Sequence, residues 1–89
     1  MIGDKVFKAL SDPTRRRIIH LLNQSEMTAG EIAEQFHVTA PTISHHLNVL
    51  KEADAVSVRR DGKNLIYTVN TTVMQDLLAF LLDVFGEKK

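Results

Sequence analysis

The sequence contains no cysteine and no excess of either charge. Without thiols the chain can form no disulfide, no thiolate metal site and no cysteine nucleophile. Its 11 Lys and Arg balance 11 Asp and Glu, which excludes the strongly basic composition that by itself indicates nucleic-acid binding. Any contact with DNA must therefore come from small local groups of residues.

Long apolar runs are missing as well. Charged residues interrupt the N-terminal stretch MIGDKVFKALSDP, which excludes a signal peptide, and we therefore expect the protein in the cytoplasm. Residues 72–85 are mostly apolar, but this stretch is too short for a bilayer and polar residues interrupt it. We expect no membrane span.

Length and composition predict a single domain over residues 1–89. The 89 residues leave no room for a second core, and 44% hydrophobic with 25% charged residues is typical of a soluble globular protein. One core of this size is thin, and no disulfide supports it. We therefore expect association with a partner subunit.

The first two predicted helices follow from apolar spacing and a capping signal. Ile2 and later apolar residues predict a short helix near 2–10. Asp12 before Pro13 is an N-cap followed by proline at the first helical position, and this second helix is expected to end near Asn23.

Two further helices lie close together in the sequence. Thr28 and Glu31 form a capping box that starts a third helix. A short connection leads to Thr39, which is the expected N-cap of a fourth helix near 40–53. The two helices therefore flank a tight turn.

The chain after the fourth helix predicts a β-hairpin and one last helix. Two runs rich in β-forming residues surround an Asp-Gly turn over residues 56–69. Thr71 or Thr72 is the expected cap of a helix over 72–85, in which 10 of 14 residues are apolar. Such a helix needs contacts on nearly every side.

This order of elements is typical of a winged helix-turn-helix, a mainly α fold with a small β-hairpin. Four helices come first, two strands follow, and a fifth helix closes the chain. In that fold the second helix of the helix-turn-helix enters the major groove of DNA and the hairpin flanks it. DNA binding is therefore the first functional hypothesis.

The fourth helix has one apolar face and one polar face. Small polar side chains can hydrogen-bond to base edges and phosphates, although any amphipathic helix has a solvated face. The hairpin favours DNA, because three cations lie within five residues at its turn. The residues selected in this way are Thr42, Ser44, His45, Asn48, Arg59, Arg60 and Lys63.

The densest basic run consists of Arg15, Arg16 and Arg17 at the start of the second helix. Positive charge there opposes the helix dipole. Phosphate contact is one interpretation, but salt bridges to Asp12 or to glutamates are the favoured one.

Several stretches match a known pattern in order: ALSDPTRRRIIHLL, the helix PTISHHLNVL, and G-K-x-x-x-Y in the hairpin. Together they resemble the ArsR/SmtB family of bacterial winged-helix repressors over nearly the whole chain. The resemblance implies homodimers that bind operator DNA and repress transcription. VFKALSDPTRR, MTAGEIAE and NTTVMQDLL most resemble the small SdpR-like autorepressors that lack metal sites, which implies autoregulation.

The resemblance also implies roles for individual residues. It places Ser44 and His45 at the positions of the recognition helix that contact DNA, while the entry of that helix consists of Thr39, Ala40, Pro41 and Thr42. His46 lies beside the core on the helical wheel and is interpreted as structural. Asp54 stands where the family often has glycine after this helix.

No cofactor, metal site or catalytic centre is predicted. The third-helix stretch EIAEQF lacks the cysteines of arsenite and heavy-metal sensors in this family, and the last helix offers only Asp76 and Asp83 as metal ligands. Ser44 and His45 are adjacent, but neighbouring helix positions diverge and no acid is placed to orient the histidine. Release from DNA by a ligand and by a partner protein both stay open.

A protein-docking module without operator binding is the alternative function. Winged helices can serve as docking domains, and residues 37–69 carry four positive and three negative side chains, a net charge of only +1. A dimer doubles its phosphate contacts, and uncharged donors and helix N-termini add to them. The modest charge therefore favours selective, salt-sensitive DNA binding.

The helices near 2–10 and 72–85 have more apolar surface than a small core can cover. We therefore predict that they form a homodimer interface, although the same side chains would otherwise only close the core of one chain. The predicted interface residues are Phe7, Leu77, Phe80, Leu81 and Val84.

Overall fold

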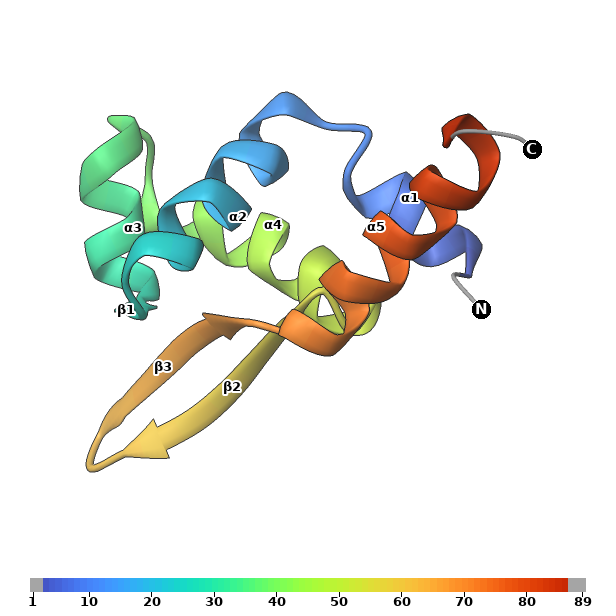
Figure 1. Cartoon of the computed structure of the whole chain (residues 1–89). Coiled ribbons are helices and arrows are strands. Elements are labelled where there is room, and N and C mark those ends of the chain that lie inside the picture. The colour runs from blue at the N-terminus through green and yellow to red at the C-terminus, as the bar shows by residue number, and fades with distance from the viewer. Residues whose placement is uncertain (1–2, 87–89) are drawn as a thin grey trace.

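A computed structural model describes residues 3–86 of the chain (Figure 1). Its elements are α1 (Asp4–Ala9), α2 (Pro13–Gln24), β1 (Met27–Thr28), α3 (Ala29–Phe36), α4 (Ala40–Glu52), β2 (Val56–Asp61), β3 (Asn64–Val69) and α5 (Thr71–Phe85). The hairpin of β2 and β3 projects away from the helices, and α5 lies beside α1. The predicted winged-helix fold is confirmed. Ile2, with which the first predicted helix begins, lies outside the described residues.

The core lies among α2, α3 and α4. Ile18, Ile32, Ile43, Leu47 and Leu50 have no solvent exposure, and they come from these three helices. Since the apolar face of α4 packs inward, its opposite face is held toward solvent.

The sheet has one strand more than the sequence pattern predicts. β1 pairs antiparallel with β3, so that Met27 lies opposite Tyr67 in the strand order β1-β3-β2. Two residues are too few to produce a period-two pattern, which explains why the sequence gives no sign of this strand. Through β1, the segment between α2 and α3 is joined to the hairpin.

Three of the four predicted helix caps are confirmed. The side chains of Asp12, Thr28 and Thr39 accept hydrogen bonds from the backbone at the starts of α2, α3 and α4. The expected cap of α5 is wrong, because Asn70 holds that position and its Oδ1 accepts from the N–H of Val73 at 3.3 Å. Asparagine caps helices somewhat better than threonine.

The hairpin turn lies one residue later than predicted. Asp61 is still paired with Asn64 in the strands, and the two loop residues are Gly62 and Lys63. Gly62 has a φ of 65°, whereas Lys63 is not in the left-handed region. Glycine at the first of two loop positions is typical of a type II′ turn, which suits the twist of a hairpin.

A left-handed residue ends α4. Asp54 has a φ of 60°. Its N–H donates to the carbonyl of Lys51 at 3.0 Å, and the N–H of Ala55 donates to the carbonyl of Leu50 at 2.9 Å. These bonds are those of a Schellman motif, in which glycine is the usual left-handed residue. Asp54 thus takes the glycine role and directs the chain into β2.

Candidate nucleic-acid interface

The predicted DNA-facing residues of α4 all lie in solvent. Seven of them are exposed along the helix and its N-cap: Thr39, Ala40, Pro41, Thr42, Ser44, His45 and Asn48. The opposite side of the same helix has no exposure at Ile43, Leu47 and Leu50. α4 therefore presents a polar face that the rest of the fold leaves uncovered.

The start of α4 is ordered by its own side chains. The hydroxyl groups of Thr39 and Thr42 lie 3.0 Å apart, and Thr39 Oγ1 also accepts from the N–H of Thr42 at 3.4 Å. The first turn of a helix presents unpaired N–H groups and a partial positive charge, which favour a phosphate. This end of α4 combines that charge with small side chains.

The three cations of the hairpin differ in their surroundings. Arg59, Arg60 and Lys63 are all exposed. Within residues 3–86, no hydrogen bond or ion pair engages the side chains of Arg60 and Lys63. Both charges point to solvent from the wing.

Arg59 is instead paired with Glu26, which precedes β1. Arg59 Nη1 donates to Glu26 Oε1 at 2.8 Å, and Nη2 donates to the other carboxylate oxygen. This hydrogen bonding lowers the pKa of Glu26 and raises the pKa of Arg59. The pair ties the outer strand of the wing to the segment that leads into α3, and it neutralises one of the three wing cations.

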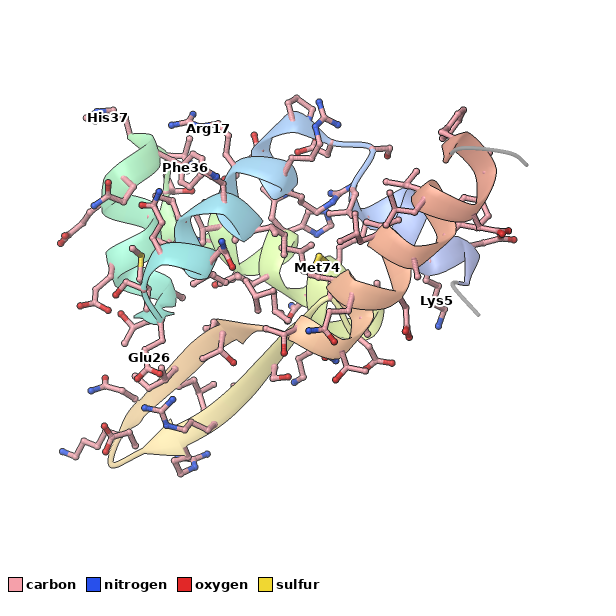
Figure 2. All side chains as sticks on the ribbon, in the orientation of Figure 1. Lys5, Arg17, Glu26, Phe36, His37 and Met74 are labelled. Atoms are coloured by element: carbon pink, nitrogen blue, oxygen red, sulfur yellow. The ribbon has the colours of Figure 1, made fainter. Side chains whose placement is uncertain are left out.

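The expectation of salt bridges for the run Arg15 to Arg17 is wrong. Arg15 Nε donates to the carbonyl of Ala9 at 2.6 Å, and Arg16 Nη1 donates to that of Leu10 at 2.9 Å. Arg17 lies 4.5 Å above the ring of Phe36, and Figure 2 shows the two side chains together. The run starts α2, but Arg15 and Arg16 lie at the end of α1, where positive charge is favourable.

His46 is held between α4 and the start of α2, as its structural interpretation predicts. Its side chain is only 16% exposed. Its Nδ1 lies 3.2 Å from Arg15 Nη1 and 4.0 Å from Asp12 Oδ2. Burial raises the pKa of Asp12, but the backbone N–H of Arg15 and the nearby His46 outweigh it, and the pKa is lowered.

α5 keeps its apolar side chains largely in solvent. None of its fifteen residues, all of which the structure describes, is buried. Of the predicted interface residues, Phe7, Phe80, Leu81 and Val84 are exposed, and Leu77 is half-buried. The rings of Phe7 and Phe80 meet edge to face with centroids 5.5 Å apart, so α1 and α5 already contact each other within one chain.

Two residues of α5 that the interface prediction leaves out are the most exposed. Leu82 is 61% and Phe85 78% exposed. On the helical wheel Phe85 stands beside Leu81 and Leu82 stands beyond Phe85, so the two residues widen the apolar face. Leu82 and Phe85 are among the ten apolar residues counted in this helix from the sequence. Only the structure shows which of the ten the core leaves uncovered.

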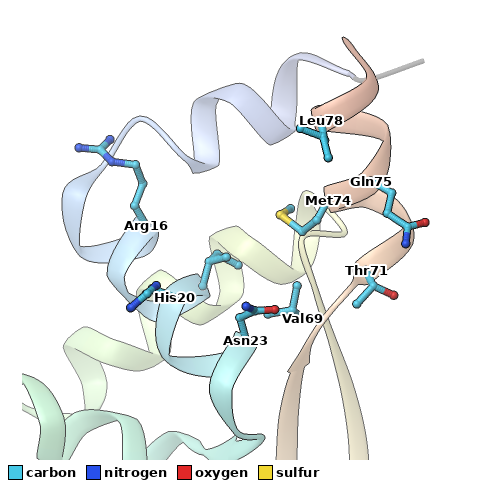
Figure 3. A pocket seen from close by; sticks show the side chains of 9 residues that line it. Arg16, His20, Asn23, Val69, Thr71, Met74, Gln75 and Leu78 are labelled. Carbon is cyan, nitrogen blue, oxygen red and sulfur yellow. The ribbon is translucent and has the colours of Figure 1, made fainter. Parts of the chain in front are cut away.

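A cavity of about 540 Å³ lies between α2 and α5 (Figure 3). Its lining joins Ile19, Val69, Met74 and Leu78 with polar residues at the rim, which are Arg16, His20, Asn23, Thr71 and Gln75. Figure 3 shows Arg16 extending away from Met74 and Leu78. The wall of the cavity that belongs to α5 is half apolar, with Met74 and Leu78, and half polar, with Thr71 and Gln75.

Two further properties concern only the part of the chain that the structure describes. Residues 3–86 contain no group of three or more His, Asp or Glu side chains arranged to hold a metal ion. No helix in that part has the length and apolar character needed to cross a membrane.

Comparison with known proteins identifies the chain. The family described as bacterial regulatory protein, arsR family, matches residues 12–58, from the N-cap of α2 into β2 and over more than half of the chain. The chain belongs to the ArsR family. This ArsR-family chain is similar to the transcriptional repressor SdpR of Bacillus subtilis (strain 168), with 52% identity over 84 residues that cover 94% of this chain and 93% of that protein.

Other relatives agree with this assignment. The ArsR-family chain is 34% identical over 73 residues to an arsenical resistance operon repressor of Staphylococcus aureus, which covers 82% of this chain and 70% of that protein. A crystal structure of a possible transcriptional regulator for arsenical resistance matches with a TM-score of 0.80 and 34% identity, over 98% of this chain and 88% of that one. The resemblance found in the sequence is confirmed.

Proposed function

We propose that this ArsR-family protein is a homodimeric, sequence-specific DNA-binding repressor that inserts α4 into the major groove and uses the hairpin as a wing. The observation that carries the proposal is the exposed polar face of α4 opposite a fully buried apolar face. The similar proteins named as repressors support it.

The side chains of α4 suit base and backbone contacts. Ser44 and His45 donate and accept hydrogen bonds, and Asn48 can form a bidentate pair with adenine. Thr39 and Thr42 lie at the helix start, where a phosphate is favoured. These groups read and position the duplex without a strongly basic surface.

The wing adds charge beside the recognition helix. Arg60 and Lys63 reach phosphates or the minor groove, whereas Arg59 first has to leave Glu26 to do so. We therefore assign the phosphate contacts of the wing to Arg60 and Lys63 before Arg59. Each phosphate contact that these cations form adds to the salt sensitivity of binding.

A second copy is the partner proposed for α1 and α5. The apolar face of Phe7, Leu77, Phe80, Leu81 and Val84 continues into Leu82 and Phe85. A two-fold dimer presents two α4 helices, which fit half-sites of a near-palindromic operator about 34 Å apart or a multiple of that spacing. A cytoplasmic location is part of this proposal, since the operator DNA of a bacterial repressor lies there.

The proposed target is the promoter of the protein's own gene, as the likeness to SdpR-like repressors implies. Fluorescence anisotropy tests it with a labelled duplex from upstream of that gene, a scrambled duplex of equal composition, and two salt concentrations. Wild-type protein is expected to bind the upstream duplex selectively at physiological salt.

Two variants locate the contact. His45→Ala is expected to weaken operator binding at least about fivefold, since a lost base contact costs about 1–3 kcal/mol. Arg60→Ala is expected to weaken binding to both duplexes and to reduce the salt slope by about 1 per chain. Lys5→Ala is the charge-matched control, because Lys5 is exposed on α1, and it is expected to bind as wild type.

Binding no better than to scrambled DNA, with no effect of either variant, contradicts the proposal. It favours the docking-module alternative.

A further inference from the structure

One half-buried guanidinium group connects three helices. Arg15 belongs to α2, and it donates to the carbonyls of Ala9 at 2.6 Å and Lys8 at 3.3 Å at the end of α1. Its Nη1 lies 3.2 Å from Nδ1 of His46 on α4. The helix that carries the proposed DNA contacts is therefore joined through Arg15 to α1, which belongs to the proposed dimer interface.

The chemistry of this contact decides which ring nitrogen of His46 accepts the hydrogen bond. A guanidinium has only N–H donors and stays charged, so the imidazole nitrogen facing it must accept. While this hydrogen bond is formed, Nδ1 carries no proton and the ring N–H is on Nε2. A proton on Nδ1 would place two donors against each other, and an imidazolium would also place two positive charges there.

The charged groups around His46 determine which contacts its protonated ring would form. Arg15 on α2 repels an imidazolium, whereas Asp12 on α2 attracts it from 4.0 Å. The ring of His45, its titratable neighbour on α4, has its centroid 5.7 Å from that of His46. On α1, Arg15 donates to the carbonyl of the charged residue Lys8. Asp12 Oδ2 is already the acceptor that caps α2 through the N–H of Arg15 at 3.1 Å.

We propose that Arg15 and His46 are positioning residues for the recognition helix, and that protonation of His46 breaks the Arg15 contact that orients α4 and thereby weakens operator binding. In the neutral state Arg15 holds His46. In the protonated state the Nδ1–H turns to Asp12, and the bond that joins α4 to α1 through Arg15 is lost. The inference rests on the proposed function, since it assumes that α4 binds DNA.

The variant His46→Asn separates the effect of His46 protonation from the effect of its hydrogen bond to Arg15. The Asn Oδ1 lies where Nδ1 lies, and it accepts from Arg15 without titrating. Anisotropy titrations on the operator duplex from pH 8 to pH 5.5, at fixed ionic strength, give the ratio of the wild-type to the His46→Asn dissociation constant. The other three histidines are common to both proteins, so their titration cancels in the ratio.

The ratio is expected to rise by about two- to tenfold as the pH falls, which corresponds to one lost hydrogen bond. A ratio that stays constant while wild-type protein binds the operator overturns the inference. Arg15→Lys is expected to weaken binding and flatten the same pH profile, because one ammonium cannot serve three acceptors in a fixed fork. Arg17→Lys is the matched control, since Arg17 lies on Phe36.

A measurement without DNA distinguishes failure of the His46 inference from failure of the proposed function. Long-range ¹H–¹⁵N spectra of the free protein at pH 8 are expected to show His46 in the Nε2–H tautomer. An Nδ1–H tautomer overturns the inference even where operator binding is normal. If wild-type protein binds no operator at pH 8, the proposed function fails and the positioning role fails with it.

Discussion

Single residues in this protein take their roles from neighbours that are distant in the sequence. Arg15, Arg16 and Arg17 are identical side chains in one run, yet two hold carbonyls at the end of α1 and one stacks on Phe36. The helix-dipole argument treats the run as unfavourable because it considers only the helix to which the run belongs. The contact with α1 requires the loop between α1 and α2 to bring the two helix ends together.

Glu26 and Arg59 provide a prediction at the same scale. Because the pKa of Glu26 is lowered in the fold, the pair stabilises the protein above the unfolded-state pKa of about 4.3, and this contribution is lost as the pH falls through the lowered folded-state pKa. Glu26→Gln is expected to lower the Tm at pH 7 by a few degrees at most, since the pair is exposed. Circular dichroism melts from pH 7 to pH 3 measure the difference.

The Tm difference between the two proteins is expected to shrink below about pH 4 and to shrink in 1 M salt. Glu34→Gln is the control, because Glu34 is exposed on α3 and forms no hydrogen bond or ion pair within residues 3–86. An equal loss of Tm in both variants would show that the contact with Arg59 adds nothing.

At the scale of elements, capping residues decide where each helix begins and ends. The capping box of α3 is complete, since Thr28 Oγ1 accepts from the N–H of Glu31 at 3.1 Å and Glu31 Oε1 accepts from that of Thr28 at 2.9 Å. Such signals act within four residues, so the sequence reveals them. Asn70 was missed because two threonines follow it and offer competing caps.

The end of α4 yields a prediction about stability. Asp54 holds a left-handed conformation that glycine adopts without a Cβ clash. Asp54→Gly is expected to raise the free energy of unfolding by about 0.5–1 kcal/mol, in spite of the added entropy of the unfolded chain. Urea denaturation followed by circular dichroism measures the change.

Lys51→Gly in the last turn of the same helix is the matched control. Lys51 has ordinary helical geometry, so glycine there is expected to lower the free energy of unfolding by about 0.5–1 kcal/mol. If glycine destabilised both positions equally, the left-handed conformation of Asp54 would carry no cost.

At the scale of the whole molecule, the chain has more apolar surface than it covers. Leu82 and Phe85 stand in solvent on a helix without a buried residue, and burial of such side chains is worth about 1.5–3 kcal/mol each. We therefore expect a particle of twice the 10.0 kDa of one chain at micromolar concentration in sedimentation equilibrium.

Leu82→Glu is expected to raise the dimer dissociation constant more than tenfold, because it buries an unpaired carboxylate on each side of the two-fold axis. Ala79→Glu adds the same charge on the side of α5 that carries Gln75 and Asp83, and the variant is expected to stay dimeric. A wild-type monomer at micromolar concentration would contradict the interface.

The sequence by itself determined the elements and the face of α4, because helical periodicity, caps and turn residues act over a few neighbouring positions. Ile43, Leu47 and Leu50 are buried and Ser44, His45 and Asn48 are exposed, as their spacing predicts. Only the tertiary structure decided which charges are already engaged. β1, the pair of Glu26 with Arg59, and the contact of Arg15 with α1 and His46 join residues far apart in the chain. Their partners are set by how the helices and strands pack, and no local pattern records that packing.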